Sequence, residues 1–427
     1  LITSFSMSAT WVWAPSMFTA SEKAYLQGWI GVFWFVVPNV LTLIIFAFYA
    51  SKMRNINPDG WTFSDYIREK YNMFLIESFG LQICSLAVQL LAGATIFHKV
   101  VGLPFFQTTI ILALIPVFYS VLRGIRGNII SDFFKMIFIV AVLILGIPML
   151  FNNIGVDTFV KGLSGFDGQY GDMFSENGLN VFLTFGLPTT IGLLSGTFGD
   201  QMFWQRVFCV KGQYVKRTMI IASLIFAIVP ISLSFFGFFV GGAGVSIVDT
   251  QLVNVGAVIN FLPKWFLYLF FVMILCGLIS TVDSILCAVS SIAGHDIVMR
   301  ISEMYGPKSI GAIKIGRRIL SSVDIARITM VIVAILAIVV ANIPGITITY
   351  LFLFYGTLRS SVMLPTIFAI KGYKMSERGM FYGIIASLCI GLPIFAIGNL
   401  LSITTMIVLG SLLTIGLSGL FCKLIKD

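Results

Sequence analysis

The chain has 427 residues, of which 58% are hydrophobic and only 11% are charged, with a formal net charge of +9. Soluble domains are about 45–50% apolar and about 25% charged, so a water-soluble enzyme and a free nucleic-acid-binding protein are both excluded. On a membrane protein, excess positive charge is typical of cytoplasmic loops. The chain begins at Leu1 with polar residues directly behind it, which is unlike a signal peptide and indicates that a further segment precedes it.

Apolar runs of about 20 residues, the length of a membrane-spanning helix, recur along the whole chain between short polar loops. Strands of a β-barrel would be about ten residues long and would alternate in polarity. The sequence therefore predicts an all-α, polytopic membrane protein with about 12 transmembrane helices. They are expected at residues 4–20, 29–51, 73–97, 104–122, 129–151, 181–204, 218–241, 263–293, 325–343, 346–368, 380–398 and 401–422.

Basic residues are distributed unequally between alternate loops. If the loop 52–72 is cytoplasmic, most of the 27 Lys and Arg residues lie on that side, as the positive-inside rule requires. This predicts a multi-pass protein of the plasma (inner) membrane with residue 1 and the C-terminus in the cytoplasm. The mixed apolar and basic stretch 297–322 is expected to form either an interfacial amphipathic helix or a solvated loop.

The first and sixth spans contain residues that interrupt helices. The first carries Ser6-Met7-Ser8-Ala9-Thr10 and then Pro15, and the sixth is rich in Gly and Thr and contains Pro188. Broken spans in corresponding places of two oppositely oriented halves are the best sequence pointer to a transporter site. A broken helix frees backbone carbonyl and N–H groups at mid-membrane, where an ion or a solute can bind them. Close packing of small residues between helices is the alternative explanation.

The eighth span is too polar to face lipid. Gly277, Ser280 and Ser284 share one stripe of the helix, with Thr281 and Asp283 beside it. Hydroxyl and carboxylate oxygens suit a hard cation, and a carboxylate inside the membrane is costly enough to indicate function. Hydrogen bonds from the hydroxyls back to their own helix are the alternative, but they leave the carboxylate unexplained.

The stretch 277–297, with Ser280-Thr281-Val282-Asp283-Ser284 and the closing His295-Asp296-Ile297, resembles the eighth core helix of the sodium:solute symporters. The resemblance covers nearly the whole chain and implies a LeuT-type core of two inverted five-helix repeats. It divides a single transporter domain, 1–427, into a first repeat at 1–152, a second at 181–370 and additional C-terminal helices at 371–427. Thr10-Trp11-Val12-Trp13-Ala14, followed by Gly28 and Phe33-Trp34, is similar to the urea and polyamine permease branch.

The resemblance also implies a sodium ion between the eighth core helix and the break in the first. The matching ligands are the carbonyls of Ser8, Trp11 and Gly277 and the hydroxyls of Ser280 and Thr281. Some members bind a second sodium, and by position Asp132, Asp283 and Ser284 would hold that ion or line the ion exit path. Asp283 stands where those members have serine, and Lys135 stands where the family often has glutamine.

Candidate solute contacts lie on the first, third, sixth and tenth spans. Gln82, Ser85 and Gln89 form a polar stripe suited to a small polar solute or to a neighbouring helix. Trp11 and Trp13 either wall a pocket or pack in the core. The other candidates are Thr189, Thr190, Ser195 and Thr197 on the sixth span and Tyr350 and Tyr355 on the tenth.

Arg359 lies deep in the tenth span. A buried guanidinium must pair with a carboxylate or reach water. It is therefore expected to act as a gate contact or as the counter-ion of a substrate carboxylate, unless it snorkels toward the cytoplasm.

These features predict a sodium-coupled secondary symporter that imports a small polar organic solute by alternating access. Its partners would be the solute, the coupling ion Na+ and the lipid bilayer, with no nucleic acid and no enzymatic activity. Two alternatives remain open. One is a proton-coupled symporter, since Asp132 and Asp283 can titrate, and the other is a membrane sensor or input domain of the same fold. A channel would need a continuous pore, which the interrupted pair of spans argues against.

Overall fold

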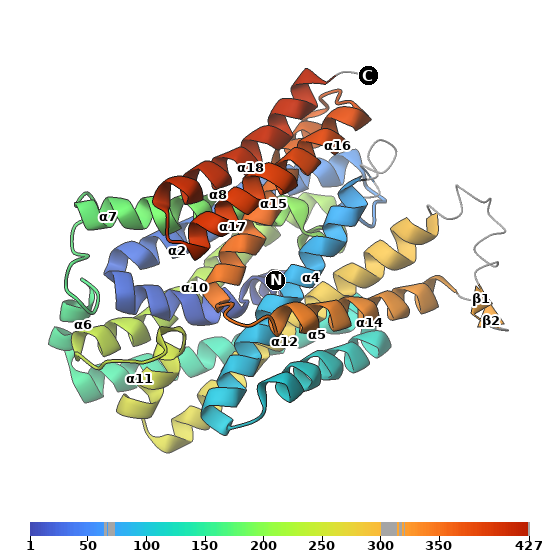
Figure 1. Ribbon diagram of the computed structural model, residues 1–427. Coiled ribbons are helices and arrows are strands. Elements are labelled where there is room, and N and C mark those ends of the chain that lie inside the picture. The colour runs from blue at the N-terminus through green and yellow to red at the C-terminus, as the bar shows by residue number, and fades with distance from the viewer. Residues whose placement is uncertain (64–65, 67–72, 300–313, 316–317, 320, 426–427) are drawn as a thin grey trace.

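The computed structural model describes residues 1–63, 66, 73–299, 314–315, 318–319 and 321–425, and shows a bundle of helices (Figure 1). Within these residues, ten helices are long and apolar enough to cross a membrane, which confirms the all-α, polytopic fold. Two expected spans are not among the ten. The span 4–20 is split between two helices, and only Phe105–Phe118 of the span 104–122 counts as a shorter apolar helix.

The elements occur in the following order. The first half contains α1 (Ile2–Trp11), α2 (Ala14–Ile56), α4 (Met73–Ile96), η1 (Phe97–Val101), α5 (Phe105–Ile154) and α6 (Val156–Gly162). The middle contains α7 (Glu176–Val181), η2 (Phe182–Gly186), α8 (Leu187–Gly199), α9 (Gln201–Phe208), η3 (Gly212–Tyr214), α10 (Val215–Gly242), η4 (Thr250–Leu252) and α11 (Val253–Phe261). The last part contains α12 (Lys264–Ser291), η5 (Ile292–Ile297), β1 (Lys314–Ile315), β2 (Arg318–Ile319), α14 (Ser322–Ala341), α15 (Ile348–Lys371), α16 (Glu377–Ala386), η7 (Ser387–Gly391), α17 (Leu392–Leu400) and α18 (Thr404–Leu424).

Strand structure is confined, among the described residues, to the antiparallel pair β1 and β2, in which Lys314 faces Ile319. This pair falls inside the stretch 297–322, for which the sequence suggested an amphipathic helix or a solvated loop. Most of that stretch lies outside the described residues.

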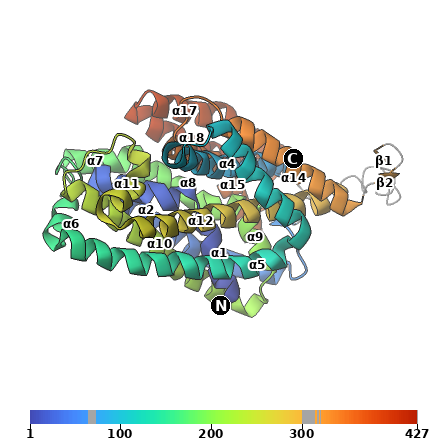
Figure 2. The same ribbon diagram turned by 90° about the horizontal axis from the view of Figure 1, so that it is seen from below.

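Two helices are interrupted near the middle of the bundle. Between α1 and α2, Trp13 adopts an extended conformation with φ −99° and ψ −179°. Between α8 and α9, Asp200 does the same with φ −104° and ψ 118°. The first break lies where the sequence predicted it, whereas the second follows Gly199 directly, at the far end of the Gly-rich stretch. Figure 2 shows α1 close to α5, α9 and α12, so both breaks lie near the eighth predicted span.

A third interruption is a bend in α2 at Gly28, which has φ 57° and ψ −151°. Residues with side chains rarely adopt this conformation. The bend also brings the backbone against the segment after α6: Trp29 N–H donates to the Leu163 carbonyl at 2.8 Å, and Phe166 N–H donates to the Tyr25 carbonyl at 2.7 Å. A Cβ on Gly28 would lie 2.3 Å from the Leu163 carbonyl oxygen. The bend therefore fixes α2 to the segment 163–166, which follows α6 at one end of the bundle.

We expect Gly28→Ala to lower the thermal stability of the purified protein. The backbone conformation alone costs a residue with a side chain about 1–3 kcal/mol, and the contact with the Leu163 carbonyl adds to this. The matched control is Gly416→Ala in α18, where a new Cβ would meet nothing within 4 Å and where alanine favours the helix. Equal melting temperatures for the two variants in detergent would contradict this account of the bend.

Candidate ion and solute site

Backbone and hydroxyl oxygens converge where α1 ends against α12. The Thr281 hydroxyl lies 3.3 Å from the Thr10 carbonyl, 3.5 Å from the Val12 carbonyl and 3.4 Å from the Gly277 carbonyl. All four residues are buried. We call this group of oxygens the oxygen cage. The end of α1 makes the cage possible. In a continuing helix, the carbonyls of Thr10 and Val12 would accept hydrogen bonds from N–H groups four residues later.

The other residues of the predicted sodium site lie around this cage. The Ser8 carbonyl accepts from the Val12 N–H at 2.9 Å, and the Trp11 carbonyl accepts from the Ser16 hydroxyl at 3.2 Å. The Ser280 hydroxyl donates to Asp132 Oδ1 at 2.6 Å. The Ser280 hydroxyl thus binds the buried carboxylate on α5, while the hydroxyl of its neighbour Thr281 lies in the cage.

A charge cluster lies beside the cage and consists of Asp132, Lys135, Arg206 and Asp283, from α5, α9 and α12. Asp132 Oδ2 accepts from Arg206 Nη2 at 3.0 Å, and Lys135 Nζ donates to Asp283 Oδ2 at 2.7 Å. Lys135 Nζ also lies 3.7 Å from Asp132 Oδ1. Both carboxylates and Arg206 are fully buried. The cluster has no formal net charge, which is the condition under which ionised groups are tolerated away from water.

Hydroxyl groups connect the charge cluster to α1. Ser6 Oγ donates to Asp132 Oδ2 at 2.9 Å, and Arg206 Nη2 donates to Ser284 Oγ at 2.6 Å. Thr10 Oγ1 and Ser284 Oγ are 3.0 Å apart. Ser284 is therefore already engaged by Arg206 and α1.

A second ion pair lies at the break between α8 and α9. Asp200 Oδ2 accepts from Arg359 Nη2 at 3.1 Å and from the Tyr355 hydroxyl at 2.5 Å, and Asp200 Oδ1 accepts from Gln82 Nε2 at 2.9 Å. Arg359 also contacts the Tyr355 hydroxyl and lies 5.2 Å from the centre of the Trp13 ring. Arg359 is thus paired and buried rather than snorkelling to water.

Several buried polar atoms on α1, α4, α8 and α15 and in the break after α1 find no hydrogen-bond partner within the described part of the chain. They are Nε1 of Trp11 and Trp13, Nε2 of Gln89, Oε1 of Gln82, Oγ1 of Thr189 and Thr197, and Nε and Nη1 of Arg359. Buried polar groups are normally hydrogen-bonded, so each such atom calls for a partner. The region between α2, α4, α8 and α15 therefore offers mostly donors to a small polar ligand.

The predicted solute residues are only partly brought together. Gln82 and Gln89 lie at the α8–α9 break and at the start of α2, where Gln89 Oε1 accepts from the Ala14 N–H at 2.9 Å. Ser85 is fully buried beside Tyr355. In contrast, the hydroxyls of Thr190 and Ser195 donate to carbonyls four residues earlier in their own helix, and Tyr350 lies near the first turn of α15 against Phe354.

Sequence reasoning missed two residues at the centre of these networks. Asp200 lies inside the predicted span 181–204, so the cost of an intramembrane carboxylate, which singled out Asp283, applied to it equally. Arg206 directly follows that span, where the charge pattern suggested a loop residue, yet it is fully buried. The hydrophobic pattern carried no signal for its burial, because its partner Asp132 is 74 positions away in the sequence.

The two ends of the bundle differ. At the end formed by α6, α7 and α11 (Figure 1), Glu22 accepts from the hydroxyls of Thr250 at 3.1 Å and Thr349 at 2.6 Å. Asn254 Nδ2 donates to the Met17 carbonyl at 2.6 Å. These contacts join α2 to η4, α11 and α15, and they close the bundle over the break at this end.

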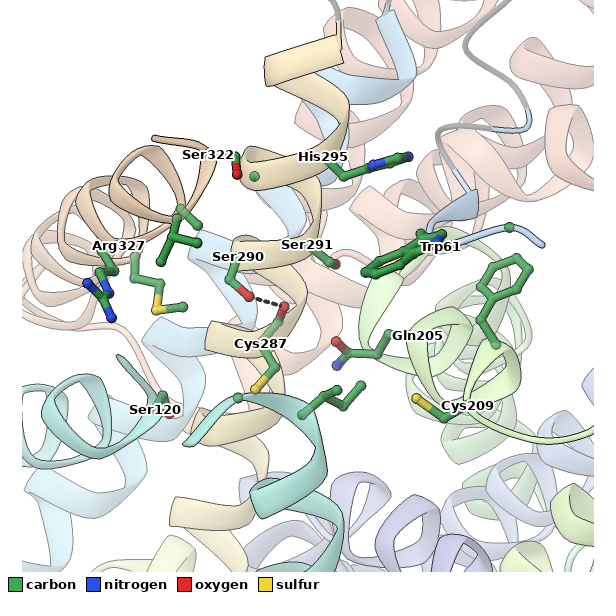
Figure 3. Close-up of a pocket in the computed structure, with 18 of the residues that line it drawn as sticks. Trp61, Ser120, Gln205, Cys209, Cys287, Ser290, Ser291, His295, Ser322 and Arg327 are labelled. Atoms are coloured by element: carbon green, nitrogen blue, oxygen red, sulfur yellow. Dashed lines mark hydrogen bonds between the residues drawn. The ribbon is translucent and has the colours of Figure 1, made fainter. Parts of the chain in front are cut away.

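The opposite end, which we call the cavity end, holds a cavity of about 1110 Å³. Figure 3 shows Trp61, Gln205, Cys287, His295 and Arg327 among the residues that line it. Gln205 Nε2 donates to the Ser284 carbonyl at 3.0 Å. Gln205 of the cavity wall directly precedes Arg206 of the charge cluster in the chain, so the cavity lies next to that cluster.

Sequence comparison points to a family of membrane transporters. The model of the sodium:solute symporter family matches residues 1–387. The chain is 19% identical over 428 aligned positions to a rice (Oryza sativa subsp. japonica) protein named urea-proton symporter DUR3, covering 90% of this chain and 57% of that protein. It is 21% identical over 241 positions to probable urea active transporter 1 of Schizosaccharomyces pombe, covering 52% of this chain and 36% of that one. The match thus spans about half or less of these relatives' lengths.

Solved structures show the same fold. A Na⁺-coupled sialic acid symporter in a substrate-bound, outward-open state has a TM-score of 0.69 at 15% identity, covering 100% of this chain and 90% of that one. The inward-facing conformation of Mhp1 gives 0.52 at 14% identity, covering 98% and 90%. The likeness confirms the LeuT-type arrangement expected from the sequence. Because the family model matches most of its length, the chain belongs to the sodium:solute symporter family, whose members are membrane transporters rather than enzymes.

Proposed function

We propose that this chain is a sodium-coupled secondary symporter that imports a small, neutral, polar organic solute by alternating access. The observation that carries the proposal is the oxygen cage, in which three carbonyl oxygens lie within 3.5 Å of the Thr281 hydroxyl. Na⁺ has nearly the radius of Ca²⁺, whose ligands lie about 2.3–2.6 Å away, so neighbouring ligands on an octahedral shell are about 3.3–3.7 Å apart. Uncharged hard oxygens at this spacing suit a monovalent cation.

A cation in the cage would hold α1 against α12. We assign to this site Gly277, Ser280 and Thr281 together with the last turn of α1, from Ser8 to Val12. An ion drives a conformational change only if its affinity differs between the states. The cage meets this condition, because its oxygens come from two helices and separate when α1 moves away from α12.

The solute is proposed to bind between α2, α4, α8 and α15. Asp200 and Arg359 neutralise each other there, so a charged solute would add an uncompensated charge in a buried place. The unpartnered donors of Trp11, Trp13 and Gln89 suit a carbonyl oxygen, and Oε1 of Gln82 suits an N–H group. Urea has both, and the names of the rice and fission yeast relatives agree with it.

We also propose an orientation and a division of the chain. The cavity end is assigned to the cytoplasm, because Arg54 and Arg327, which the sequence places on the basic side, lie in the cavity wall. Residue 1 and the C-terminus then face the cytoplasm of the plasma (inner) membrane. The breaks at Trp13 and Asp200 support the two inverted repeats at 1–152 and 181–370.

Proton coupling is the second candidate. The rice relative is named a urea-proton symporter, and the buried carboxylates of Asp132 and Asp283 lie next to the cage. The two possibilities differ in a simple way: solute uptake driven by a pH gradient in the complete absence of sodium would favour protons.

Thr281→Ala is expected to abolish the sodium-dependent rise in melting temperature and sodium-stimulated urea uptake. A ligand at 100 times its Kd stabilises the folded state by about 2.7 kcal/mol, so the loss is measurable by thermal denaturation in NaCl against choline chloride. Thr414→Ala is the matched control, since it removes a buried hydroxyl that donates to Gly410 in its own helix. A sodium response with unchanged half-saturation in Thr281→Ala would contradict the site, and no response in the wild type would contradict sodium coupling.

Asp200→Asn is expected to destabilise the fold by about 3–5 kcal/mol, because it leaves the Arg359 guanidinium buried without its counter-charge. Combining it with Arg359→Gln should restore part of that loss. Yield and melting temperature of the two single variants and the double variant measure the coupling. Asp249→Asn is the control, as its carboxylate pairs with Lys99 at the surface. Strictly additive losses would show that the two charges do not depend on each other.

Trp13→Phe removes one unpartnered N–H donor and keeps an aromatic ring. If that N–H binds the solute, the apparent KM for urea should rise about fivefold, since one hydrogen bond contributes about 1 kcal/mol. The control is Trp265→Phe at the exposed start of α12. An unchanged KM in transport assays would exclude this contact.

A further inference from the structure

In the charge cluster, the ammonium group of Lys135 lies where a bound metal cation would otherwise meet the two carboxylates. Lys135 Nζ lies 2.7 Å from Asp283 Oδ2 and 3.7 Å from Asp132 Oδ1, so its ammonium group sits between two carboxylates. Its side chain is 15% exposed, whereas both carboxylates are fully buried. An inorganic cation bound to this pair of carboxylates would need the same place.

The oxygens of Asp132 and Ser284 are also engaged. Asp132 Oδ1 accepts from the Ser280 hydroxyl at 2.6 Å, and Oδ2 accepts from Ser6 at 2.9 Å and from Arg206 at 3.0 Å. The Ser284 hydroxyl receives a hydrogen bond from Arg206 at 2.6 Å. The residues expected for a second ion therefore do not fit one, because the fixed cations Lys135 and Arg206 already bind all three of them.

The charge balance leads to the same conclusion. The cluster pairs two carboxylates with one guanidinium and one ammonium, so its formal charge is zero. A further cation would raise it to +1 in a region that is removed from water, where an uncompensated charge costs several kcal/mol. Removing Lys135 would instead leave a charge of −1, and that deficit would favour the entry of a free cation.

We infer that the Lys135 ammonium takes the place of a second coupling cation, so that this chain binds at most one inorganic cation, in the oxygen cage. The inference rests on the proposed function only for the identity of that one ion. A tethered ammonium differs from a free ion in two respects. It is present at any sodium concentration, and it is not released at the other side of the membrane.

The test counts sodium ions bound to the purified protein. Radioactive sodium binding and melting temperature are measured across a range of NaCl at constant ionic strength, with choline as the replacement cation. The variants are Lys135→Gln, which removes the charge, and Lys135→Arg, which keeps it. A third, Lys135→Gln combined with Asp283→Asn, removes the carboxylate charge as well and restores neutrality.

The wild type, Lys135→Arg and the double variant are expected to bind one sodium per chain. Lys135→Gln is expected to bind one more than the wild type, with an additional sodium-dependent rise in melting temperature. Two ions per wild-type chain, or equal binding by wild type and Lys135→Gln, would overturn the inference. If Lys135→Gln cannot be purified, the wild-type count decides in the same way.

Failure of the proposed function has a different signature. A wild type that binds no sodium, together with a Lys135→Gln variant that binds one, would reject sodium coupling and support the inference about Lys135. Binding of no sodium by either protein would reject both.

Discussion

Carboxylates buried in a helical bundle need a counter-charge from the same chain, because the membrane interior supplies neither water nor ions at low cost. Asp132, Asp200 and Asp283 are all fully buried, and Arg206, Arg359 and Lys135 supply the charges that balance them. These pairs join helices that are far apart in the sequence. Much of the arrangement around the two breaks follows from this requirement.

The short helix α9 occupies a particular place in this arrangement. Asp200 caps its start, accepting from the Met202 N–H at 3.1 Å, and also binds α4 and α15. Arg206 in its last turn binds α1, α5 and α12 through Ser6, Asp132 and Ser284. Six residues of helix, about 9 Å, thus connect the region assigned to the solute with the region assigned to the ion. A rigid element with a distinct partner set at each end is a direct route for energetic coupling.

Features that depend on local sequence could be predicted, whereas contacts between distant helices could not. The spans were readable because lipid-facing helices need long apolar runs, and the break at Trp13 was readable from the polar residues before Pro15. Gly277, Ser280 and Thr281 stood out as small or polar residues in an apolar helix. Gly277 and Thr281 contribute oxygens to the cage, whereas Ser280 binds Asp132. The second break was harder to place, since a Gly-rich helix can also pack closely, and Gly192 does lie against Gly356. The pairing of Arg206 with Asp132 was not readable, because it depends on how α9 packs against α5 rather than on any local pattern.

Lys135 has a consequence for how strongly the transporter can concentrate its solute. Under the proposed stoichiometry, each cycle carries one elementary charge inward with a neutral molecule. A membrane potential of 100 mV contributes about 2.3 kcal/mol per charge, which corresponds to an accumulation ratio of about 50 at 1.36 kcal/mol per factor of ten. A second mobile ion would square that electrical ratio while admitting two sodium ions for every solute. A lysine fixed between two aspartates thus lowers the number of sodium ions that enter with each solute molecule. It also lowers the highest solute accumulation ratio that the membrane potential can support.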